Sequence, residues 1–490
     1  MPLDDTNSDQ NDPERGPWGE EKGEQAGRDY TPIPLLEKIA YGSGCLPMNA
    51  SVNSIKNLAG PIFNITLGMH PFRVGNVLLA ARFWDAFTDP VMGWISDNTK
   101  SRWGRRRPYL FIGSILTAIA YALILNVPKG LSPDALYAYF LFGSLGLYTC
   151  VTILQVSYNS LGFELSHDYH ERTNIFAYRS FFQQVSNILL GYLFYLCTLD
   201  VFGDTMTGAK YVGMGVGLVI FLFLLPTVFG VREGHAEQAA KQEKIPVVWA
   251  IKTTFKTKPF LILCGLTFVT IFGGNFNLAL GPYVNIYHVA QGDVKFGAEL
   301  QGHATAVGTI SSFVAIPILA WLSPRIGKIR TLGISIGCLL VGAILKWFAY
   351  TPTMPYLQII TQPFIRIGEM GFWLLITSMK ADVCDWDEWK TGFRREGMYG
   401  AATGWFQKVT QAITFALGQG YLLAMIGFDA TKGVDQDPGV MFWMRFLFSA
   451  LPAILAVGGL ILLRYYELDD AKAAEIKADL DQRHAQAGDD

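Results

Sequence analysis

Two carboxylates stand four residues apart in a long apolar stretch of the chain. Asp85 and Asp89 lie within residues 74–96, which are otherwise apolar and long enough to cross a hydrocarbon core of roughly 30 Å. The four-residue spacing puts both carboxylates on one face of a helix. An ionised side chain at the centre of a membrane helix costs about 2.5 to 3.5 kcal/mol, and two adjacent carboxylates ionise cheaply only when a cation or a proton joins them. The pair therefore predicts a site for a coupling cation.

The same pair also has a purely structural interpretation. Arg82 and Lys56 are predicted to lie within membrane helices as well, and these bases could neutralise the two carboxylates. The four side chains would then hold helices together without binding a cation. The residue pattern alone leaves both interpretations open.

The composition is that of a membrane protein with many spans. Of 490 residues, 51% are hydrophobic and 16% are charged, against about 25% charged in soluble domains. A chain this long and apolar is not a water-soluble enzyme, and its net charge of −2 gives no bulk field to attract nucleic acid. The sequence contains no nucleotide-binding loop, zinc-protease motif or nucleophile–base constellation. We therefore expect neither an enzyme nor an ATP-driven pump, no nucleic-acid partner, and no cofactor beyond a coupling ion.

Lys and Arg gather in alternate loops between the apolar segments, of which we count twelve. The positive-inside rule places those loops and both termini in the cytoplasm. The basic turn at residues 97–108 has a weaker echo at 323–330, which predicts two related halves. We predict an all-α fold with twelve transmembrane helices in two six-helix bundles. The predicted parts are a disordered tail at 1–31, bundles at 32–231 and 259–464, a central cytoplasmic loop at 232–258 and a charged cytoplasmic tail at 465–490.

Several motifs resemble one transporter family. RFWDAFTDPVMGW at 82–94 and SRWG at 101–104 are similar to the glycoside-pentoside-hexuronide:cation symporter family of the major facilitator superfamily, and the likeness continues at 157–173 and 381–390. The resemblance implies cation-coupled symport of a sugar or glycoside by alternating access, with Na⁺ or H⁺ as the coupling ion. It also implies a multi-pass protein of the bacterial inner membrane, and we expect a monomer. The related lysophospholipid-carrier branch shares the 82–94 pattern, so transport of a lysolipid or another amphiphile is the alternative.

The resemblance assigns roles to individual residues. It places the cation site on Asp85, Asp89, Thr88 and Thr152, with Na⁺ or a proton at the two carboxylates. It makes Lys408 link the cation and substrate sites, and we give Arg82 the same coupling role. Trp373 matches an aromatic residue of the substrate pocket, while Asn49 and Gln155 stand where a family member has galactose-binding carboxylates. The candidate substrate-binding residues are Asn49, Lys56, Gln155, Tyr158, Asn275, Arg366, Glu369 and Trp373.

The bases among these candidates bear on the charge of the substrate. Two acids fewer and two bases more, Lys56 and Arg366, should make the cavity less negative, which favours an anionic glycoside such as a uronide. Alternatively, Arg366 and Glu369 stand three apart on one helix face and neutralise each other. Lys56 would then be only the counter-charge of Asp85 and Asp89.

Charged residues at the predicted cytoplasmic helix ends could form an inner gate. Opposite charges there would pair across the two bundles only when the inner side is closed, each pair contributing about 0.2 to 1 kcal/mol. In the alternative interpretation they are ordinary topology anchors. The candidates are Asp97, Arg102, Arg107, Glu164, Arg172, Asp382, Asp385 and Arg394.

Overall fold

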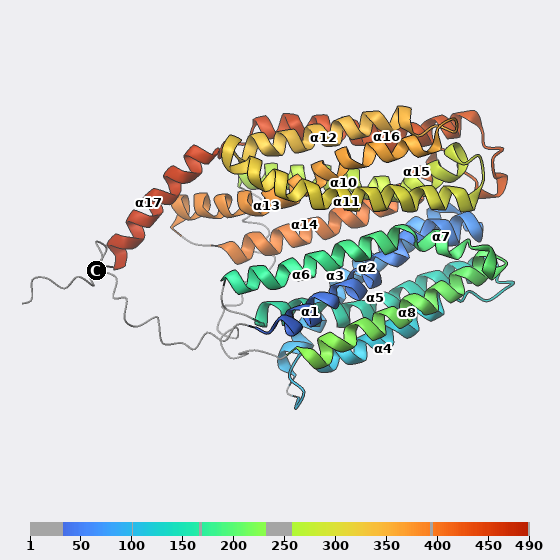
Figure 1. Cartoon of the computed structure of the whole chain (residues 1–490), viewed down its shortest axis with the longest axis horizontal. Helices are drawn as coiled ribbons and strands as arrows, with labels where there is room; N and C mark the ends of the chain where they lie inside the picture. Colours follow the sequence, from blue (N-terminus) through green and yellow to red (C-terminus); the bar gives the residue numbers. More distant parts are fainter. Residues whose placement is uncertain (1–32, 100, 166–168, 232–256, 393–394, 489–490) are drawn as a thin grey trace, which may run out of the picture.

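The computed structural model describes residues 33–99, 101–165, 169–231, 257–392 and 395–488, and these ranges fold into helices joined by turns. The helices form two bundles that lie side by side (Figure 1). The N-terminal bundle contains α1 (Leu35–Ser43), α2 (Cys45–Leu58), the π-helix η1 (Ala59–Thr66), α3 (Pro71–Asn98), α4 (Arg107–Ile124), α5 (Pro133–Glu164), α6 (Tyr169–Gly191), α7 (Leu193–Cys197), η2 (Asp200–Phe202) and α8 (Thr205–Gly230).

The C-terminal bundle follows after a gap in the described residues. It contains α10 (Lys258–Tyr283), the π-helix η4 (Val284–Val289), α11 (Val294–Ile326), α12 (Lys328–Ala349), η5 (Pro355–Ile360), α13 (Thr361–Thr391), α14 (Glu396–Ala416), the π-helix η6 (Leu417–Tyr421), α15 (Leu422–Met425), η7 (Ala430–Lys432) and α16 (Pro438–Arg464). The last helix is α17 (Asp470–Gly488). The tail predicted at 1–31, and all but the last two residues of the loop predicted at 232–258, lie outside the described residues.

Most of the long helices are apolar enough to cross a membrane. Within the described ranges eight meet this test, and a pair bent by 44°, Asn174–Gly191 with Leu193–Phe202, makes a ninth. Three helical stretches do not meet the test: 35–66, which contains Lys56, 71–98, which contains Asp85 and Asp89, and 396–425, which contains Lys408. The number twelve therefore stays a prediction. The helices that fail the apolar test thus carry Asp85, Asp89 and Lys408, the charged residues of the predicted cation and coupling sites.

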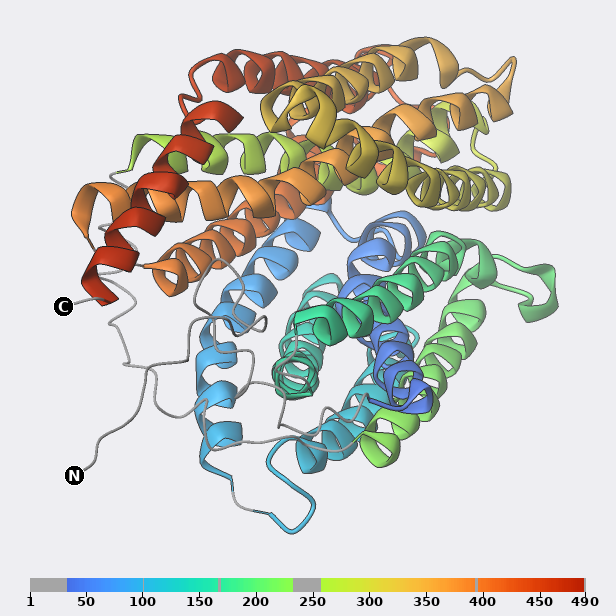
Figure 2. The same ribbon diagram turned by 60° about the vertical axis from the view of Figure 1, so that its left-hand side comes forward.

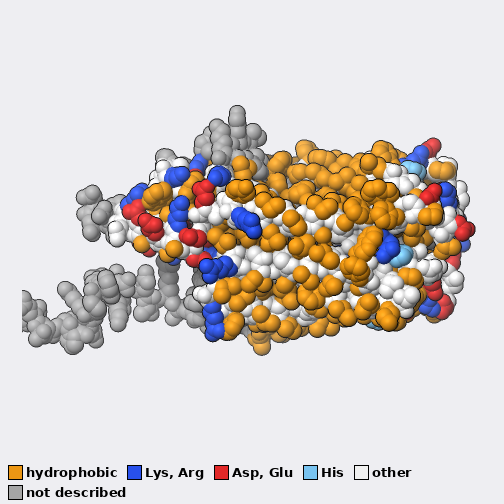
Figure 3. Space-filling model, turned by 90° about the horizontal axis from the view of Figure 1, so that it is seen from above, with side chains coloured by type: hydrophobic (Ala, Val, Ile, Leu, Met, Phe, Trp, Pro, Cys, Tyr) orange, Lys and Arg blue, Asp and Glu red, His pale blue; other side chains and the backbone are white. Residues whose placement is uncertain are grey.

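Charge and apolarity divide the surface into zones. Hydrophobic side chains cover the middle of the face in Figure 3, and charged side chains gather toward its two ends. We call the end that carries Arg102, Arg107, Lys328 and Arg395 the basic end, and the opposite end the far end. By the positive-inside rule the basic end is the predicted cytoplasmic side.

Three helices that start at the far end are capped by their own sequence. Ser132, Asp204 and Asp293 precede α5, α8 and α11, and each side chain accepts a hydrogen bond from the backbone N–H three residues later, at 3.3, 2.7 and 2.9 Å respectively. Such caps satisfy an N–H that has no partner in the first turn. The far-end turns are therefore well defined by local chemistry.

The two bundles meet at the far end. Figure 2 shows α3 of the first bundle approaching α14 of the second, and the two are in contact. Gly75 of α3 packs so closely against η6 that a Cβ placed on it would lie 2.9 Å from the Cα of Gly420. At the next residue of each segment, the hydroxyl of Tyr421 on η6 donates to Asn76 Oδ1 on α3 at 2.6 Å. Small residues thus let the backbones of the two bundles touch.

The segment predicted to be a charged tail contains a docked helix. Asp470, at the start of α17, accepts a hydrogen bond from the backbone N–H of Lys328 at 2.9 Å, and Asp479 accepts one from Trp389 at 2.6 Å. Ile476 and Leu480 are buried in the apolar core of the C-terminal bundle. α17 therefore packs on the basic end of α13 and caps the start of α12.

Candidate functional site

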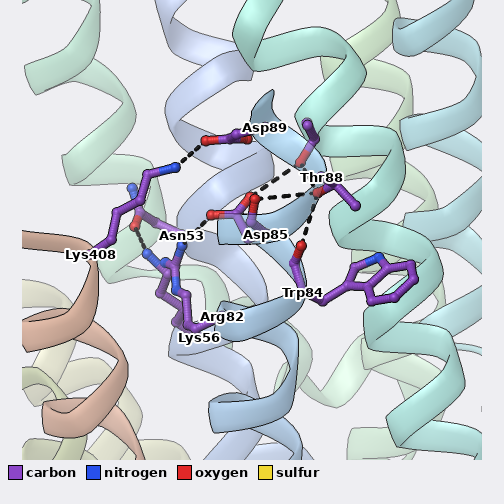
Figure 4. A network of polar contacts seen from close by, with 9 residues as sticks. Asn53, Lys56, Arg82, Trp84, Asp85, Thr88, Asp89 and Lys408 are labelled. Carbon is purple, nitrogen blue, oxygen red and sulfur yellow. Dashed lines mark hydrogen bonds and ion pairs between the residues drawn. The ribbon is translucent and has the colours of Figure 1, made fainter. Parts of the chain in front are cut away.

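The carboxylate of Asp85 lies in the middle of α3 and is almost fully buried, with 4% of the residue exposed. Its two oxygens have different partners (Figure 4): Arg82 lies 3.4 Å from Oδ2, one helical turn away, and Thr152 of α5 donates to Oδ1 at 3.2 Å. The Thr152 hydroxyl also lies 3.1 Å from that of Thr88. The Asp85 carboxylate is thus contacted by the Arg82 guanidinium and the Thr152 hydroxyl, and Thr88 contacts Thr152 in turn.

Asp89 lies one turn further along the same face and has a partner in the other bundle. Its Oδ2 forms a salt bridge with Lys408 Nζ of α14 (Figure 4). Its Oδ1 is buried and has no hydrogen-bond partner. The structure therefore brings together Asp85, Asp89, Thr88 and Thr152, as predicted, and leaves one carboxylate oxygen able to accept a proton or a cation.

Arg82 and Lys408, rather than Lys56, neutralise the two aspartates. Lys56 is buried, its Nζ donates to Asn53 Oδ1 at 2.9 Å, and it lies over the Phe415 ring at 5.5 Å from the centroid. The interpretation of Lys56 as the counter-charge of the aspartates is therefore wrong. The reason is geometric: Asn53 stands three positions before Lys56 on the same face of α2, so the ammonium reaches this neighbour on its own helix.

Two adjoining hollows share part of their lining, and the first of them is lined by both bundles. The first, of about 260 Å³, is lined on the N-terminal side by Asn49, Asn53 and Asn57 of α2 and by Gln183 and Asn187 of α6. The second, of about 200 Å³, is lined by residues of the C-terminal bundle that include Asn275, Asn277, Gln362, Glu369, Trp373 and Gln411. Leu278, Gln301, Thr305 and Arg366 line both. Amide side chains thus dominate the polar lining of the space between the bundles.

Arg366 and Glu369 both line this space and also pair with each other. Arg366 lies 2.9 Å from a Glu369 carboxylate oxygen, one turn away on α13. The Nε of Arg366 is buried without a partner. Arg366 thus lines both hollows while its charge is neutralised by Glu369.

Some predicted substrate residues lie on the hollows and others do not. Asn49, Asn275, Arg366, Glu369 and Trp373 line them. Lys56 and Gln155 are absent from the lining of both described hollows, and so is Tyr158.

Tyr158 belongs to the packed interior of the N-terminal bundle. Its hydroxyl donates to the Tyr41 carbonyl at 2.8 Å, and the two rings stack with centroids 4.8 Å apart. Arg179, which the sequence analysis did not single out, lies over the Tyr158 ring and donates to Asn159 Oδ1 at 2.9 Å. The Tyr158 side chain is thus committed to packing.

Most of the amides that line the hollows were not predicted. Asn53 and Asn57 follow Asn49 at successive four-residue steps, so a polar stripe on one face of α2 was readable from spacing alone. Gln183 and Asn187 on α6 have the same spacing. Which faces meet across the cavity depends on bundle packing, which spacing does not give.

Predicted gate residues lie at the basic end wherever they are described. Arg107 donates to the Val228 carbonyl at 2.5 Å, Asp382 pairs with Lys328 at 2.7 Å, Arg102 is exposed and Asp385 is partly buried on α13. Arg394 and the side chains of Asp97, Glu164 and Arg172 lie outside the described residues.

A further pair at the basic end was not predicted. Arg395 pairs with Asp387 at 2.5 Å. This hydrogen bond raises the pKa of the Arg395 guanidinium above its ordinary value, so the base keeps its charge. Like Lys328 with Asp382, the two residues belong to one bundle.

Comparison with known proteins agrees with this architecture. Residues 40–470 match the family described as MFS/sugar transport protein. The uncharacterized symporter YjmB of Bacillus subtilis (strain 168) is 28% identical, with 92% of this chain and 96% of that protein covered. The isoprimeverose transporter of Lactiplantibacillus pentosus is 23% identical, with 93% of each covered.

A solved structure shares the fold at low sequence identity. It is a bacterial homolog of the human lysosomal transporter Spinster in an inward-facing, unoccupied conformation, with a TM-score of 0.61, 13% identity, and 88% of this chain and 95% of that chain covered. The two bundles are thus those of a transporter fold. With the family match over 40–470, the chain is a multi-pass membrane protein that belongs to the MFS/sugar transport protein family of the major facilitator superfamily.

Proposed function

We propose that the protein is a secondary transporter that couples the entry of a monovalent cation, Na⁺ or H⁺, to the symport of a sugar or glycoside by alternating access. The observation that carries this proposal is the salt bridge between Asp89 and Lys408, which joins the two bundles beside a buried, unpartnered carboxylate oxygen. Relatives named as a symporter and as an isoprimeverose transporter support the same class.

Charge balance gives the coupling step. In the structure Arg82 and Lys408 neutralise the two carboxylates. A proton or cation that binds Asp89 takes over that role and weakens the hold of Lys408. Lys408 lies three residues before Gln411, which lines the second hollow, so a shift of this part of α14 reaches the cavity. Binding at the aspartates and binding in the hollows are therefore coupled through one helix.

The lining of the hollows suits a polyhydroxylated substrate. Amides carry both donors and acceptors, and sugar hydroxyls require both. Trp373 offers an aromatic face at the second hollow, and Arg366 offers a donor to both. The proposal includes neutral glycosides and anionic ones such as uronides. No described feature favours a lysolipid.

The test is uphill uptake into vesicles that contain the purified protein. One net charge moved down 100 mV releases about 2.3 kcal/mol, which drives roughly fifty-fold accumulation at 1.4 kcal/mol per decade. Asp85→Asn and Asp89→Asn should each abolish accumulation. An uncharged amide cannot form an ion pair with the neighbouring Arg or Lys in one state and bind the coupling cation in the other. Asp134→Asn, at an exposed position at the start of α5, is the matched control and should accumulate like the parent.

Two outcomes contradict the proposal. Accumulation by both site variants at the parental level removes the aspartates from coupling. Ion-dependent counterflow of a labelled lysolipid, with none of any sugar or glycoside, replaces the substrate class by the alternative one.

A further inference from the structure

A second cluster of charged side chains lies in the C-terminal bundle, apart from the two aspartates. Lys346 stands near the end of α12 and is 3% exposed. Arg366 and Glu369 stand near the start of α13 and pair with each other at 2.9 Å. The two helices are in contact, and α13 begins at the far end, where α12 ends. The three charged groups are therefore neighbours in the far-end part of this bundle.

Lys346 has no acid of its own. Within the described part of the chain its ammonium group forms no salt bridge and no side-chain hydrogen bond, and it lies over the Phe448 ring at 4.7 Å from the centroid. An aromatic face attracts a cation but does not neutralise it. The charge of this buried base therefore needs compensation from another residue.

Glu369 is the acid that both bases share. Lys346 interacts electrostatically with Glu369 by attraction and with Arg366 by repulsion. Cβ atoms tilt toward the N-terminus of their own helix, so Lys346 and Glu369 lean toward each other from the antiparallel helices α12 and α13. On its other side Glu369 packs against α10, where a Cβ on Gly274 would lie 2.6 Å from a carboxylate oxygen. The carboxylate is thus enclosed between α10, Arg366 and Lys346.

The presence of Lys346 changes the cost of separating Arg366 from Glu369. With a charged Lys346, the departure of Arg366 leaves the carboxylate beside a cation and relieves the repulsion between the two bases. Without Lys346, the same departure leaves a buried carboxylate with no counter-charge, which is far more costly. This argument depends on charge and not on how many hydrogen bonds Glu369 accepts.

We propose that Lys346 is a positioning residue that shares Glu369 with Arg366 and so frees Arg366 to bind the substrate. Arg366 lines both hollows, whereas Lys346 is absent from both linings. Lys346 thus acts through Glu369 and does not touch the substrate. The inference rests on the proposed function for the identity of the ligand, but not for the arrangement of the three charges.

The test measures how fast phenylglyoxal modifies Arg366 in the purified full-length protein without substrate, by mass spectrometry and relative to the exposed Arg73 in the same sample. Lys346→Met should slow the reaction about threefold, which corresponds to about 0.7 kcal/mol at 1.4 kcal/mol per decade, because Arg366 then stays with Glu369. Lys346→Arg keeps the base and should keep the parental rate. Lys432→Met removes a base at an exposed far-end position and is the control, which should also react like the parent.

Removal of the acid separates sharing of Glu369 from direct repulsion between the bases. In Glu369→Gln the reaction of Arg366 should become faster, since its counter-charge is gone. Adding Lys346→Met to this variant should then have much less effect than it has in the parent. An equal slowing in both backgrounds would mean that Lys346 acts on Arg366 directly, which overturns the shared role of Glu369.

The failing outcomes are distinct from those of the proposed function, because the labelling needs neither substrate nor an ion gradient. A parental rate of modification in Lys346→Met overturns the inference, whatever the protein transports. If the labelling follows the expected pattern but ion-driven uptake of every sugar and glycoside is absent, the proposed function fails, and with it the substrate as the ligand of Arg366.

Discussion

Asp89 and Lys408 come from opposite bundles, 319 positions apart in the chain, and form a salt bridge near the middle of α3 and α14. Their side chains are 23% and 39% exposed, so the pair is neither sealed from solvent nor at the surface. A partly desolvated charge that loses its partner is costly, and the cost disappears when both charges are removed.

Removing both members of this pair should therefore harm stability less than the single losses suggest. We expect Asp89→Asn and Lys408→Gln each to lower thermal stability in detergent, and the double variant to recover a coupling energy of roughly 0.5 to 3 kcal/mol. The exposed pair of Arg73 and Asp134 provides the reference cycle, for which we expect at most about 1 kcal/mol. Strictly additive losses at Asp89 and Lys408 would mean that the ion pair contributes nothing.

Sequence reasoning at this scale was accurate where one helix carries the information. The spacing of Asp85 and Asp89 indicated a shared helix face, and the resemblance added Thr152 and Lys408. It was inaccurate for Lys56, because a choice between an aspartate and an amide as partner depends on distances between helices. For Arg366 both hypotheses hold in part, since the side chain pairs with Glu369 and still lines the hollows.

At the scale of elements, the close contact between α3 and η6 sets how the far end closes. Gly75 has no room for a side chain, because a Cβ there would meet the backbone of Ala416 and Gly420 at 2.9 Å. Backbone atoms cannot rotate away as a flexible side chain can. A methyl group at this position must therefore separate the two bundles.

Gly75→Ala should shift the protein toward a state that is open at the far end. The change also favours the helix by up to about 1 kcal/mol, so the effect would not reflect loss of α3. We expect faster labelling of a cysteine at Thr305, on the lining of both hollows, by an impermeant maleimide added from the far side. Gly93→Ala on the same helix is the control, because a Cβ there meets nothing within 4 Å. Equal labelling of the two variants would contradict the prediction.

Element types were more predictable from the sequence than their ends. Apolar length and charged loops gave the helices of the two bundles. The docking of α17 was not predicted, although Ile476 and Leu480 stand four apart in a polar segment and both become buried. Only the presence of α13 beside them turns that weak signal into a packed helix. The three π-helical segments were likewise not predicted.

At the scale of the whole molecule, the bundles are joined at the far end, and the ion pairs Lys328–Asp382 and Arg395–Asp387 at the basic end each stay within one bundle. These two ion pairs hold the helices of the C-terminal bundle to one another, whereas the contacts at the far end join the two bundles.

The inner-gate hypothesis remains a prediction and can be tested by combined neutralisation. Arg102→Gln, Asp382→Asn and Asp385→Asn together should raise labelling of the Thr305 cysteine from the basic end, because pairs that close the inner side can no longer form. Each pair contributes only about 0.2 to 1 kcal/mol, so single changes should have small effects. Unchanged labelling of the triple variant would make these residues plain topology anchors.

The amide partner of Lys56 has an electrical consequence. Because that ammonium is matched by Asn53 instead of an acid, the centre around the aspartates holds three bases, Lys56, Arg82 and Lys408, and two acids (Figure 4). An unloaded protein with such a centre carries positive charge into the field of the bilayer, where one elementary charge is worth about 2.3 kcal/mol per 100 mV. A membrane potential that is negative inside would hold this charge toward the cytoplasm. A bound cation adds one more positive charge to this centre, so the reorientation of the loaded protein moves more charge than that of the unloaded one and would be the more voltage-sensitive step of the cycle.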